Sequence, residues 1–162
     1  MFKKFNLLFL TFFMVGRVKY APGSIASFIA CILFILLVNI FTIGSIFLLV
    51  LFFFLYSFVA INNSYDEFKA DDPQEIVVDE VVGQMLALLA IPVYETLYPL
   101  PLEYYCVFAF LLFRLFDIWK PYPINYIDEN IKGSLGIMLD DIMAGIYAIL
   151  IMSLVLYFLG GW

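Results

Sequence analysis

The stretch GIMLDDIMAGIYAILIMSLVLYFL at residues 136–159 decides the fold, because it joins two acidic residues to a long apolar run. One helical crossing of a bilayer needs about 20 mostly apolar residues, so the part from 139 to 159 predicts a membrane helix. Asp140 and Asp141 lie at its start. A charged group at a bilayer centre costs at least ~2.5 kcal/mol, and such groups usually pair, bind ions or face water. This pair therefore indicates a site.

The composition of the whole chain agrees with a membrane protein. Hydrophobic residues make up 65% of the 162 residues, the mean hydropathy is +1.05 and only 14% are charged, whereas a soluble domain has about 25% charged residues. We therefore expect an all-α, polytopic membrane bundle that forms a single domain over residues 1–162. The net charge is −6, and nucleic acid is not an expected partner.

Apolar runs predict five membrane helices, near 24–39, 44–62, 76–92, 103–119 and 139–159. An earlier run at 5–15 is too short to span and predicts an interfacial or half-inserted helix before the bundle of residues 24–159. The third helix is the weakest candidate, since Asp79 and Glu80 leave little apolar sequence before Pro92. A partly re-entrant third segment is the alternative.

The distribution of basic residues predicts the orientation. If all five segments cross, the loops at 16–23, 62–75 and 120–138 share one side, and the loops on the other side carry no Lys or Arg. The first side holds Arg17, Lys19, Lys69, Lys120 and Lys132. By the positive-inside rule this side is cytoplasmic. The polar stretch 62–75 is expected to be a surface loop.

The same topology brings distant acidic residues to one face. Asp79 and Glu80 begin the third predicted helix, Asp117 ends the fourth, and Asp140 with Asp141 begins the fifth. Carboxylate oxygens favour hard cations such as Mg²⁺, and the chain contains no histidine, which disfavours zinc. Ordinary charge pairing at helix ends is the alternative.

Glycines follow two of these carboxylates at a spacing of four. Asp79 precedes Gly83 and Asp141 precedes Gly145, so each glycine lies one turn away on the same helix face. Small residues let membrane helices approach closely. We therefore expect close helix packing beside the acidic residues.

Basic and polar residues near the acids suit a phosphate. Arg114 and Lys120 flank Asp117 at spacings of three, which places them on one helix face. Ser24 follows Pro22 and Gly23, and the free N–H groups at a helix start bind anions. Simple capping is the alternative for Ser24.

Three segments together resemble a known family. APGSIAS (21–27), IVVDEVVGQM (76–85) and FRLFDIWKPYPINYIDENIKGSLGIMLDDIMAG (113–145) resemble the bacterial phosphatidylglycerophosphatase A family, over about residues 16 to 150. The resemblance implies Mg²⁺-dependent hydrolysis of phosphatidylglycerophosphate to phosphatidylglycerol and inorganic phosphate. It also implies a bacterial cytoplasmic membrane, with the site facing the cytoplasm among membrane lipids.

On this resemblance each candidate residue receives an expected role. The metal ligands would be Asp79, Asp117, Asp140 and Asp141, the base would be Glu80, and the substrate contacts would be Ser24, Arg114 and Lys120. Direct attack by water and a two-step route through an aspartyl-phosphate both remain open.

Other classes of protein place carboxylates in membranes as well. A cation channel or transporter would carry acids at its mouth, but it would also need polar residues through the bilayer, and the second and fifth segments lack them. A structural or assembly protein would not need converging acids. A CDP-alcohol phosphotransferase would show a spaced signature that the chain does not contain.

Overall fold

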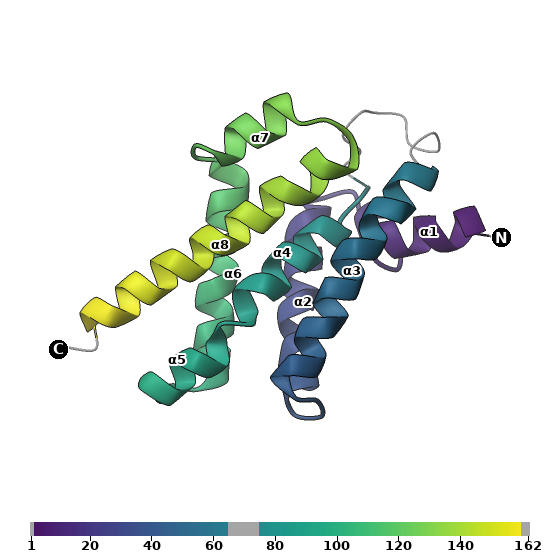
Figure 1. The fold of residues 1–162 in the computed structure, drawn as a ribbon. Helices are drawn as coiled ribbons and strands as arrows, with labels where there is room; N and C mark the ends of the chain where they lie inside the picture. The colour runs from purple at the N-terminus through teal and green to yellow at the C-terminus, as the bar shows by residue number, and fades with distance from the viewer. Residues whose placement is uncertain (1, 65–74, 160–162) are drawn as a thin grey trace.

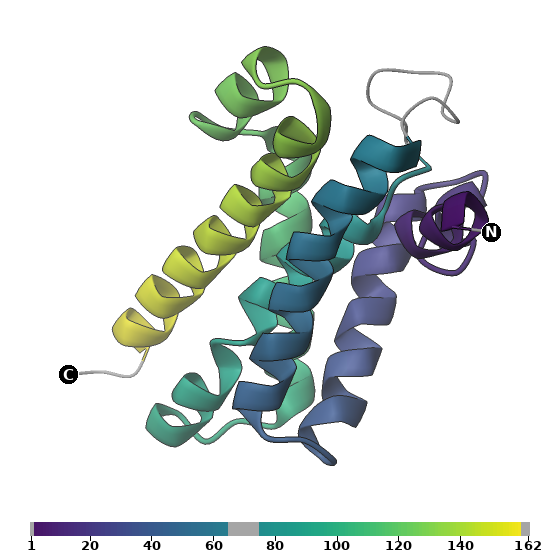
Figure 2. The same cartoon turned by 45° about the vertical axis from the view of Figure 1, so that its right-hand side comes forward.

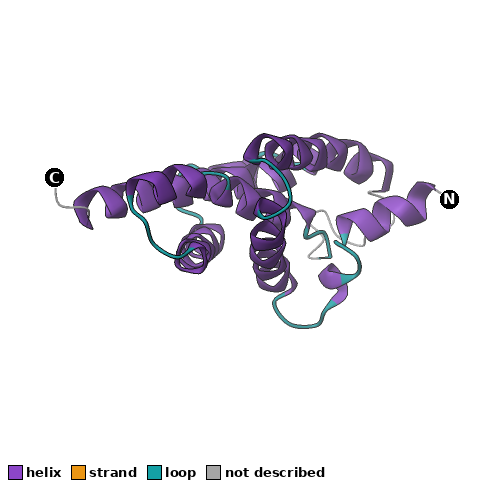
Figure 3. Ribbon diagram, turned by 90° about the horizontal axis from the view of Figure 1, so that it is seen from below, coloured by secondary structure: helices purple, strands orange, loops and turns teal. Residues whose placement is uncertain are grey.

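The computed structural model describes residues 2–64 and 75–159, and within these ranges it consists of helices and loops without a strand (Figure 3). The helices are α1 (Phe2–Leu10), the short 3₁₀ helix η1 (Val15–Arg17), α2 (Pro22–Val38), α3 (Ile43–Ser64), α4 (Val78–Leu88), α5 (Ile91–Leu97), α6 (Leu102–Trp119), α7 (Ile124–Asn130) and α8 (Gly133–Leu159). The expected all-α class is confirmed. The expected surface loop lies mostly outside the described residues.

Successive long helices run in opposite directions. In Figure 1, α2, α4 and α8 run from the upper end to the lower end, while α3 and α6 run upward; Figure 2 shows the same arrangement from a second side. The starts of α4 and α8 and the end of α6 therefore lie at one end of the bundle. The candidate site residues come from these three helix ends.

Three segments are long and apolar enough to cross a membrane: Ile43–Ser64, Val78–Leu97 and Gly133–Leu159. The apolar helix α2 has only 17 residues. Helix α6 has 18 residues and carries Glu103, Arg114 and Asp117. The described part of the chain thus has three candidate spans, and the expected number of five crossings is not confirmed.

The third predicted helix is broken in the structure. Helix α4 ends at Leu88 and α5 begins at Ile91, where the sequence predicted one helix over 76–92. Pro92 lacks the N–H that would donate to the carbonyl of Leu88, and its ring clashes with that carbonyl. The proline therefore ends α4, and α5 continues as a separate short helix at the lower end of the bundle (Figure 1).

The sequence predicted a loop at 120–138. This prediction is wrong, because the segment contains α7 and the first two turns of α8. Gly136 allows this fold. A Cβ atom at residue 136 would overlap the Ile131 carbonyl group, because its oxygen would be only 1.9 Å away. The first turn of α8 can thus pack directly against the end of α7.

The N-terminal segment forms a hook. Helix α1 covers Phe2–Leu10, and the predicted helix over 5–15 is interrupted by left-handed residues 12–14, with φ between 42° and 74°. The Tyr56 hydroxyl of α3 donates a 2.8 Å hydrogen bond to Asn6 Oδ1, and the Val77 N–H donates to the Leu10 carbonyl at 3.0 Å. The hook is therefore fixed to α3 and to the start of α4. Its interfacial location stays a prediction.

Helices α4 and α8 cross in backbone contact. A Cβ atom at Gly83 would lie 2.6 Å from the Asp141 carbonyl oxygen and 2.7 Å from the Phe113 ring. A Cβ atom at Gly145 would lie 2.6 Å from the Gly83 carbonyl oxygen. Each glycine faces backbone that cannot rotate away, so the close packing expected from the glycine spacing is present.

We expect Gly83→Ala to destabilise the protein, because the added methyl group must push α8 away from α4. Overpacking of this kind costs about 1–3 kcal/mol. The measurement is the temperature at which the detergent-solubilised protein loses its monodisperse peak on size exclusion. Gly44→Ala is the matched control, since its Cβ would meet nothing closer than Thr42 Oγ1 at 4.0 Å. Loss of the monodisperse peak at the same temperature in Gly83→Ala and Gly44→Ala would contradict the prediction.

Candidate functional site

Three carboxylates meet near the starts of α4 and α8. Asp79 and Glu80 lie in the first turn of α4, and Asp141 lies in the third turn of α8. Each offers a carboxylate oxygen that lies within 4.8 Å of those of the other two. Asp79 is 8% exposed and Asp141 is 3% exposed. We call these three residues the carboxylate cluster.

Two further carboxylates are bound to cations. Arg114 NH1 lies 2.5 Å from Asp117 Oδ2, one turn along α6, and both side chains are mostly buried. Lys120 Nζ lies 2.9 Å from Asp140 Oδ2 of α8 and 2.6 Å from Asp128 Oδ1 of α7. These ion pairs join the ends of α6, α7 and α8.

Backbone geometry directs Lys120 toward its partners. The residue follows α6 in a left-handed conformation (φ 46°), and its N–H donates to the Phe116 carbonyl at 2.8 Å. Burial lowers the pKa of Lys120, but hydrogen bonds and charge attraction from Asp128 and Asp140 outweigh burial and raise this pKa above its ordinary value. Lys120 therefore carries a permanent positive charge at the site.

All eight site residues predicted from the sequence line one cavity of about 460 Å³. The cavity is bounded by Lys19, Ala21, Pro22, Gly23, Ser24, Ile76, Asp79, Glu80, Arg114, Asp117, Ile118, Lys120, Asp140 and Asp141. We call it the acidic cavity. The segments that the sequence places at one end of the bundle thus surround a single space.

The grouping inside the acidic cavity differs from the expected division of roles. Glu80, expected as a base, belongs to the carboxylate cluster with Asp79 and Asp141. Asp117 and Asp140, expected as metal ligands, lie outside this cluster and each form an ion pair with a basic side chain; their metal-ligand role stays a prediction. Among the described residues, three carboxylates thus form no ion pair and two are each paired with a basic side chain.

The start of α2 forms another wall of the acidic cavity. Helix α2 begins at Pro22 with Ala21 as its N-cap, so the alternative of simple capping by Ser24 is wrong. Ser24 is the third residue of the helix and is half-buried, and its expected contact with the substrate stays a prediction. Gly23 lets the Glu80 carboxylate approach, because a Cβ at this position would lie 1.9 Å from Glu80 Oε1. The α2 backbone and Glu80 are therefore in direct contact.

Sequence reasoning missed two residues. Asp128 was not among the eight candidates, but it forms an ion pair with Lys120. Pro121 and Pro123 interrupt the helical pattern between Lys120 and Asp128, so no helical spacing relates these two residues. Lys19 was not among the eight candidates, although the sequence places it beside a turn that suits a phosphate, and the structure places it on the wall of the acidic cavity. Its position just before the turn at Ala21 was the available signal.

The carboxylate cluster suits a hard divalent cation. Glu80 Oε2 and Asp141 Oδ1 are buried and accept no hydrogen bond within the described ranges 2–64 and 75–159. A buried carboxylate oxygen without a donor or counter-ion is costly. Oxygen ligands of this kind are those that Mg²⁺ takes in proteins. The three side chains therefore offer the oxygen ligands that a hard divalent cation takes, close enough together to hold one metal ion.

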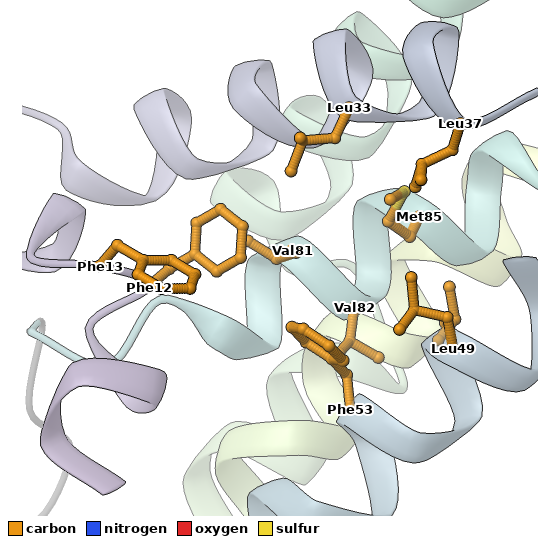
Figure 4. Close-up of a pocket in the computed structure, with 10 residues that line it drawn as sticks. Phe12, Phe13, Leu33, Leu37, Leu49, Phe53, Val81, Val82 and Met85 are labelled. Carbon is orange, nitrogen blue, oxygen red and sulfur yellow. The ribbon is translucent and has the colours of Figure 1, made fainter. Parts of the chain in front are cut away.

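A second cavity has the opposite chemistry. It measures about 200 Å³ and lies between α2, α3, α4 and the N-terminal hook (Figure 4). Its walls are entirely apolar and consist of Phe12, Phe13, Leu33, Leu37, Leu49, Val50, Phe53, Val81, Val82 and Met85. Apolar cavities of similar size stay dry and accept hydrocarbon, so this space does not suit an ion or a phosphate.

The fold and the acidic cavity define a helical protein with candidate membrane spans and a carboxylate-rich pocket at one end. The chain belongs to the family described as Phosphatidylglycerophosphatase A, whose model matches residues 8–156. Members of this family are phosphoric monoester hydrolases, and the chain is an enzyme of that class.

Three curated relatives support this assignment. A Bacteroides thetaiotaomicron protein, named as a candidate phosphatidylinositol-3-phosphatase, is 34% identical over 93% of this chain and 92% of its own length. The Phosphatidylglycerophosphatase A of Haemophilus influenzae is 33% identical over 89% of this chain and 84% of its own. That of Escherichia coli is 38% identical over 55% and 45%, respectively. No solved structure shows a significant match to the chain.

We expect Mg²⁺ to raise the melting temperature of the purified protein, and Asp141→Asn to abolish this shift. A ligand at 100 times its dissociation constant stabilises the folded state by about 2.7 kcal/mol. The measurement is thermal unfolding with and without Mg²⁺, which requires no substrate. Glu103→Gln is the control, because this exposed acid lies in the first turn of α6 outside the acidic cavity. If Mg²⁺ raised the melting temperature of Asp141→Asn as much as that of the parent protein, the metal assignment would be refuted.

Proposed function

We propose that the chain hydrolyses phosphatidylglycerophosphate to phosphatidylglycerol and inorganic phosphate, with Mg²⁺ bound by the carboxylate cluster. The observation that carries the proposal is the acidic cavity, which combines that cluster with Arg114 and Lys120 in a chain of this family. Two of the three relatives are named for this substrate.

The charges of the acidic cavity support a bound cation. Five carboxylates and three basic side chains line it, which leaves two negative charges in excess when all are ionised. A phosphate monoester carries a charge of about −1.5 to −2 near neutral pH, so the protein alone would repel it. One Mg²⁺ balances the excess. The cavity thus needs the cation before it can admit the substrate.

Asp79 and Asp141 would hold Mg²⁺, because they are the most buried members of the cluster. When bound, Mg²⁺ would neutralise phosphoryl oxygens and lower the pKa of an attacking water. Glu80 Oε2 accepts no hydrogen bond from the described residues, so it is free to take the proton of that water. The leaving glycerol oxygen takes a proton from solvent at the open side of the cavity.

Arg114 and Lys120 would stabilise negative charge on the phosphoryl oxygens. Phosphoryl-transfer catalysis depends chiefly on positioning and on such stabilisation. Asp117 and Asp140 hold these two cations at 2.5 Å and 2.9 Å, respectively. In this proposal the two aspartates position cations, whereas Ser24 on α2 contacts a phosphoryl oxygen from the opposite wall.

A second substrate deserves the same test, because the Bacteroides relative matches most of this chain and is named for phosphatidylinositol 3-phosphate. Like phosphatidylglycerophosphate, that lipid carries a phosphodiester and, on the far side of its polyol, a phosphate monoester. The carboxylate cluster acts on the monoester and does not distinguish the two lipids. A channel or transporter is not favoured, since the family consists of hydrolases.

We further propose that the protein lies in the bacterial cytoplasmic membrane with the acidic cavity facing the cytoplasm. Lys19 and Lys120 line this cavity, and Arg17 and Lys132 lie close to them in the chain. Basic residues mark the cytoplasmic side. A lipid phosphate at the headgroup level can then enter laterally while its acyl chains stay in hydrocarbon.

We expect Asp79→Asn, Asp117→Asn and Asp141→Asn each to lower turnover of phosphatidylglycerophosphate at least ~100-fold, since loss of a charge-stabilising group commonly costs that much. The assay measures phosphate release by purified protein in detergent with Mg²⁺ or EDTA, with phosphatidylinositol 3-phosphate as the second substrate. Glu95→Gln is the control, because α5 lies at the opposite end of the bundle (Figure 1). Near-normal rates in all three aspartate variants would reject this mechanism.

Five crossings predict that the C-terminus lies on the periplasmic side, opposite the acidic cavity. A reporter that is fluorescent only in the cytoplasm, fused after Trp162, should therefore remain dark, whereas the same reporter inserted between residues 65 and 74 should fluoresce. A fluorescent C-terminal fusion would show that an even number of segments lies between the two positions, contrary to the proposed topology.

A further inference from the structure

The basic residues of the acidic cavity are not equivalent. Arg114 is bound to Asp117, and Lys120 is bound to Asp128 and Asp140. Lys19 also lines the cavity, but it forms no ion pair within the described ranges. It is thus the one cation of the cavity wall whose charge no described carboxylate offsets.

The local backbone brings Lys19 to the cavity wall. Ala21 adopts a left-handed conformation (φ 46°, ψ 52°) and Pro22 opens α2, so the chain turns sharply just after Lys19. The Lys19 ammonium lies 5.4 Å from the centre of the Tyr20 ring, a distance at which a cation is attracted by an aromatic face. The lysine therefore lies beside the start of α2, on the same wall as Ser24.

Arg17, only two residues earlier, has a different environment. Its Nε lies 3.3 Å from Glu75 Oε2, and it does not line the acidic cavity. The two basic residues share sign and sequence neighbourhood, but only Lys19 faces the cavity. This contrast provides a matched pair for experiment.

The cavity is larger than a single phosphate group requires. Pockets that enclose whole small ligands measure about 300–1,000 Å³, and this one measures about 460 Å³. The carboxylate cluster, Arg114 and Lys120 account for the phosphate that is cleaved. Space and one cation remain for a second anionic group of the same molecule.

We propose that Lys19 binds the phosphodiester of the lipid headgroup, which is the phosphate that is not cleaved. This inference rests on the proposed function. The phosphodiester carries one negative charge and is separated from the monoester by the polyol of the headgroup. Lys19 thereby selects lipids that carry both a phosphodiester and a monoester over phosphatidic acid, which has the monoester alone. Lys19 is a specificity residue, and the chemistry of cleavage does not involve it.

The test compares the parent protein with Lys19→Gln, Lys19→Arg and Arg17→Gln in detergent with Mg²⁺. Lys19→Gln removes a charge-assisted hydrogen bond to the phosphodiester, so it should raise KM for phosphatidylglycerophosphate about tenfold with kcat within about twofold. Phosphatidic acid, measured as substrate or as competitive inhibitor, should bind both proteins equally. Inorganic phosphate should also inhibit both equally. Lys19→Arg should restore most of the affinity, and Arg17→Gln should match the parent.

Three results would overturn the proposal. An equal loss of affinity for phosphatidylglycerophosphate and phosphatidic acid would mean that Lys19 only attracts anionic lipids. A fall in kcat would place Lys19 at the cleaved phosphate, and an unchanged KM would place the phosphodiester elsewhere. Failure of the proposed function is distinguishable, because the parent protein itself would then release no phosphate from phosphatidylglycerophosphate, and both proposals would fall together.

Discussion

The backbone contact between α4 and α8 is the constraint on which the rest of the structure depends. Gly83 and Gly145 face the backbone of the opposite helix at distances that exclude any side chain. Each glycine lies one turn beyond a carboxylate on its own helix. The crossing that leaves no room for a side chain at residues 83 and 145 therefore also brings Asp79 and Asp141 together. Wider packing would separate these oxygens, and a cation could no longer bridge them. The same contact therefore determines both the packing of the bundle and the spacing of the carboxylate cluster.

Close packing also brings five carboxylates together, and the described residues supply cations to only two of them. Asp117 and Asp140 receive cations from the protein, through Arg114 and Lys120. The carboxylate cluster receives none from the described residues, and two of its oxygens are buried without a donor. Like charges held together away from water are unfavourable unless a counter-ion is present. The division of the five acids into paired and unpaired sets is thus itself an argument for a bound metal, independent of the family.

The sequence predicts the site better than it predicts the segments around it. The approximate ends of the helices can be predicted because an apolar run that crosses a membrane has a characteristic length. Successive helices alternate in direction, and this alternation brings Asp79, Asp117 and Asp141 to one end of the bundle. The break at Pro92 and the helix α7 depend on local details instead. Pro121 and Pro123 give a loop-like pattern, and the early start of α8 requires a contact between Gly136 and the Ile131 carbonyl. Such a contact between backbones leaves no periodic signal in the side chains.

In the proposed site, the cations that are held by carboxylates act in catalysis, and the cation that is not held acts in substrate recognition. A cation held by a neighbouring carboxylate loses little further freedom when a phosphoryl group arrives, so its stabilisation acts fully on the transition state. Arg114 and Lys120 are held in this way. An exposed, unpaired lysine must be ordered by its ligand, and its contact with a group that does not react is equal in ground state and transition state. Binding of that kind changes KM without changing kcat. On the proposals made here, the ion pairs of Arg114 and Lys120 and the absence of one at Lys19 among the described residues would thus correspond to different kinetic parameters. A single cavity would then bind a whole headgroup and cleave only one of its phosphates.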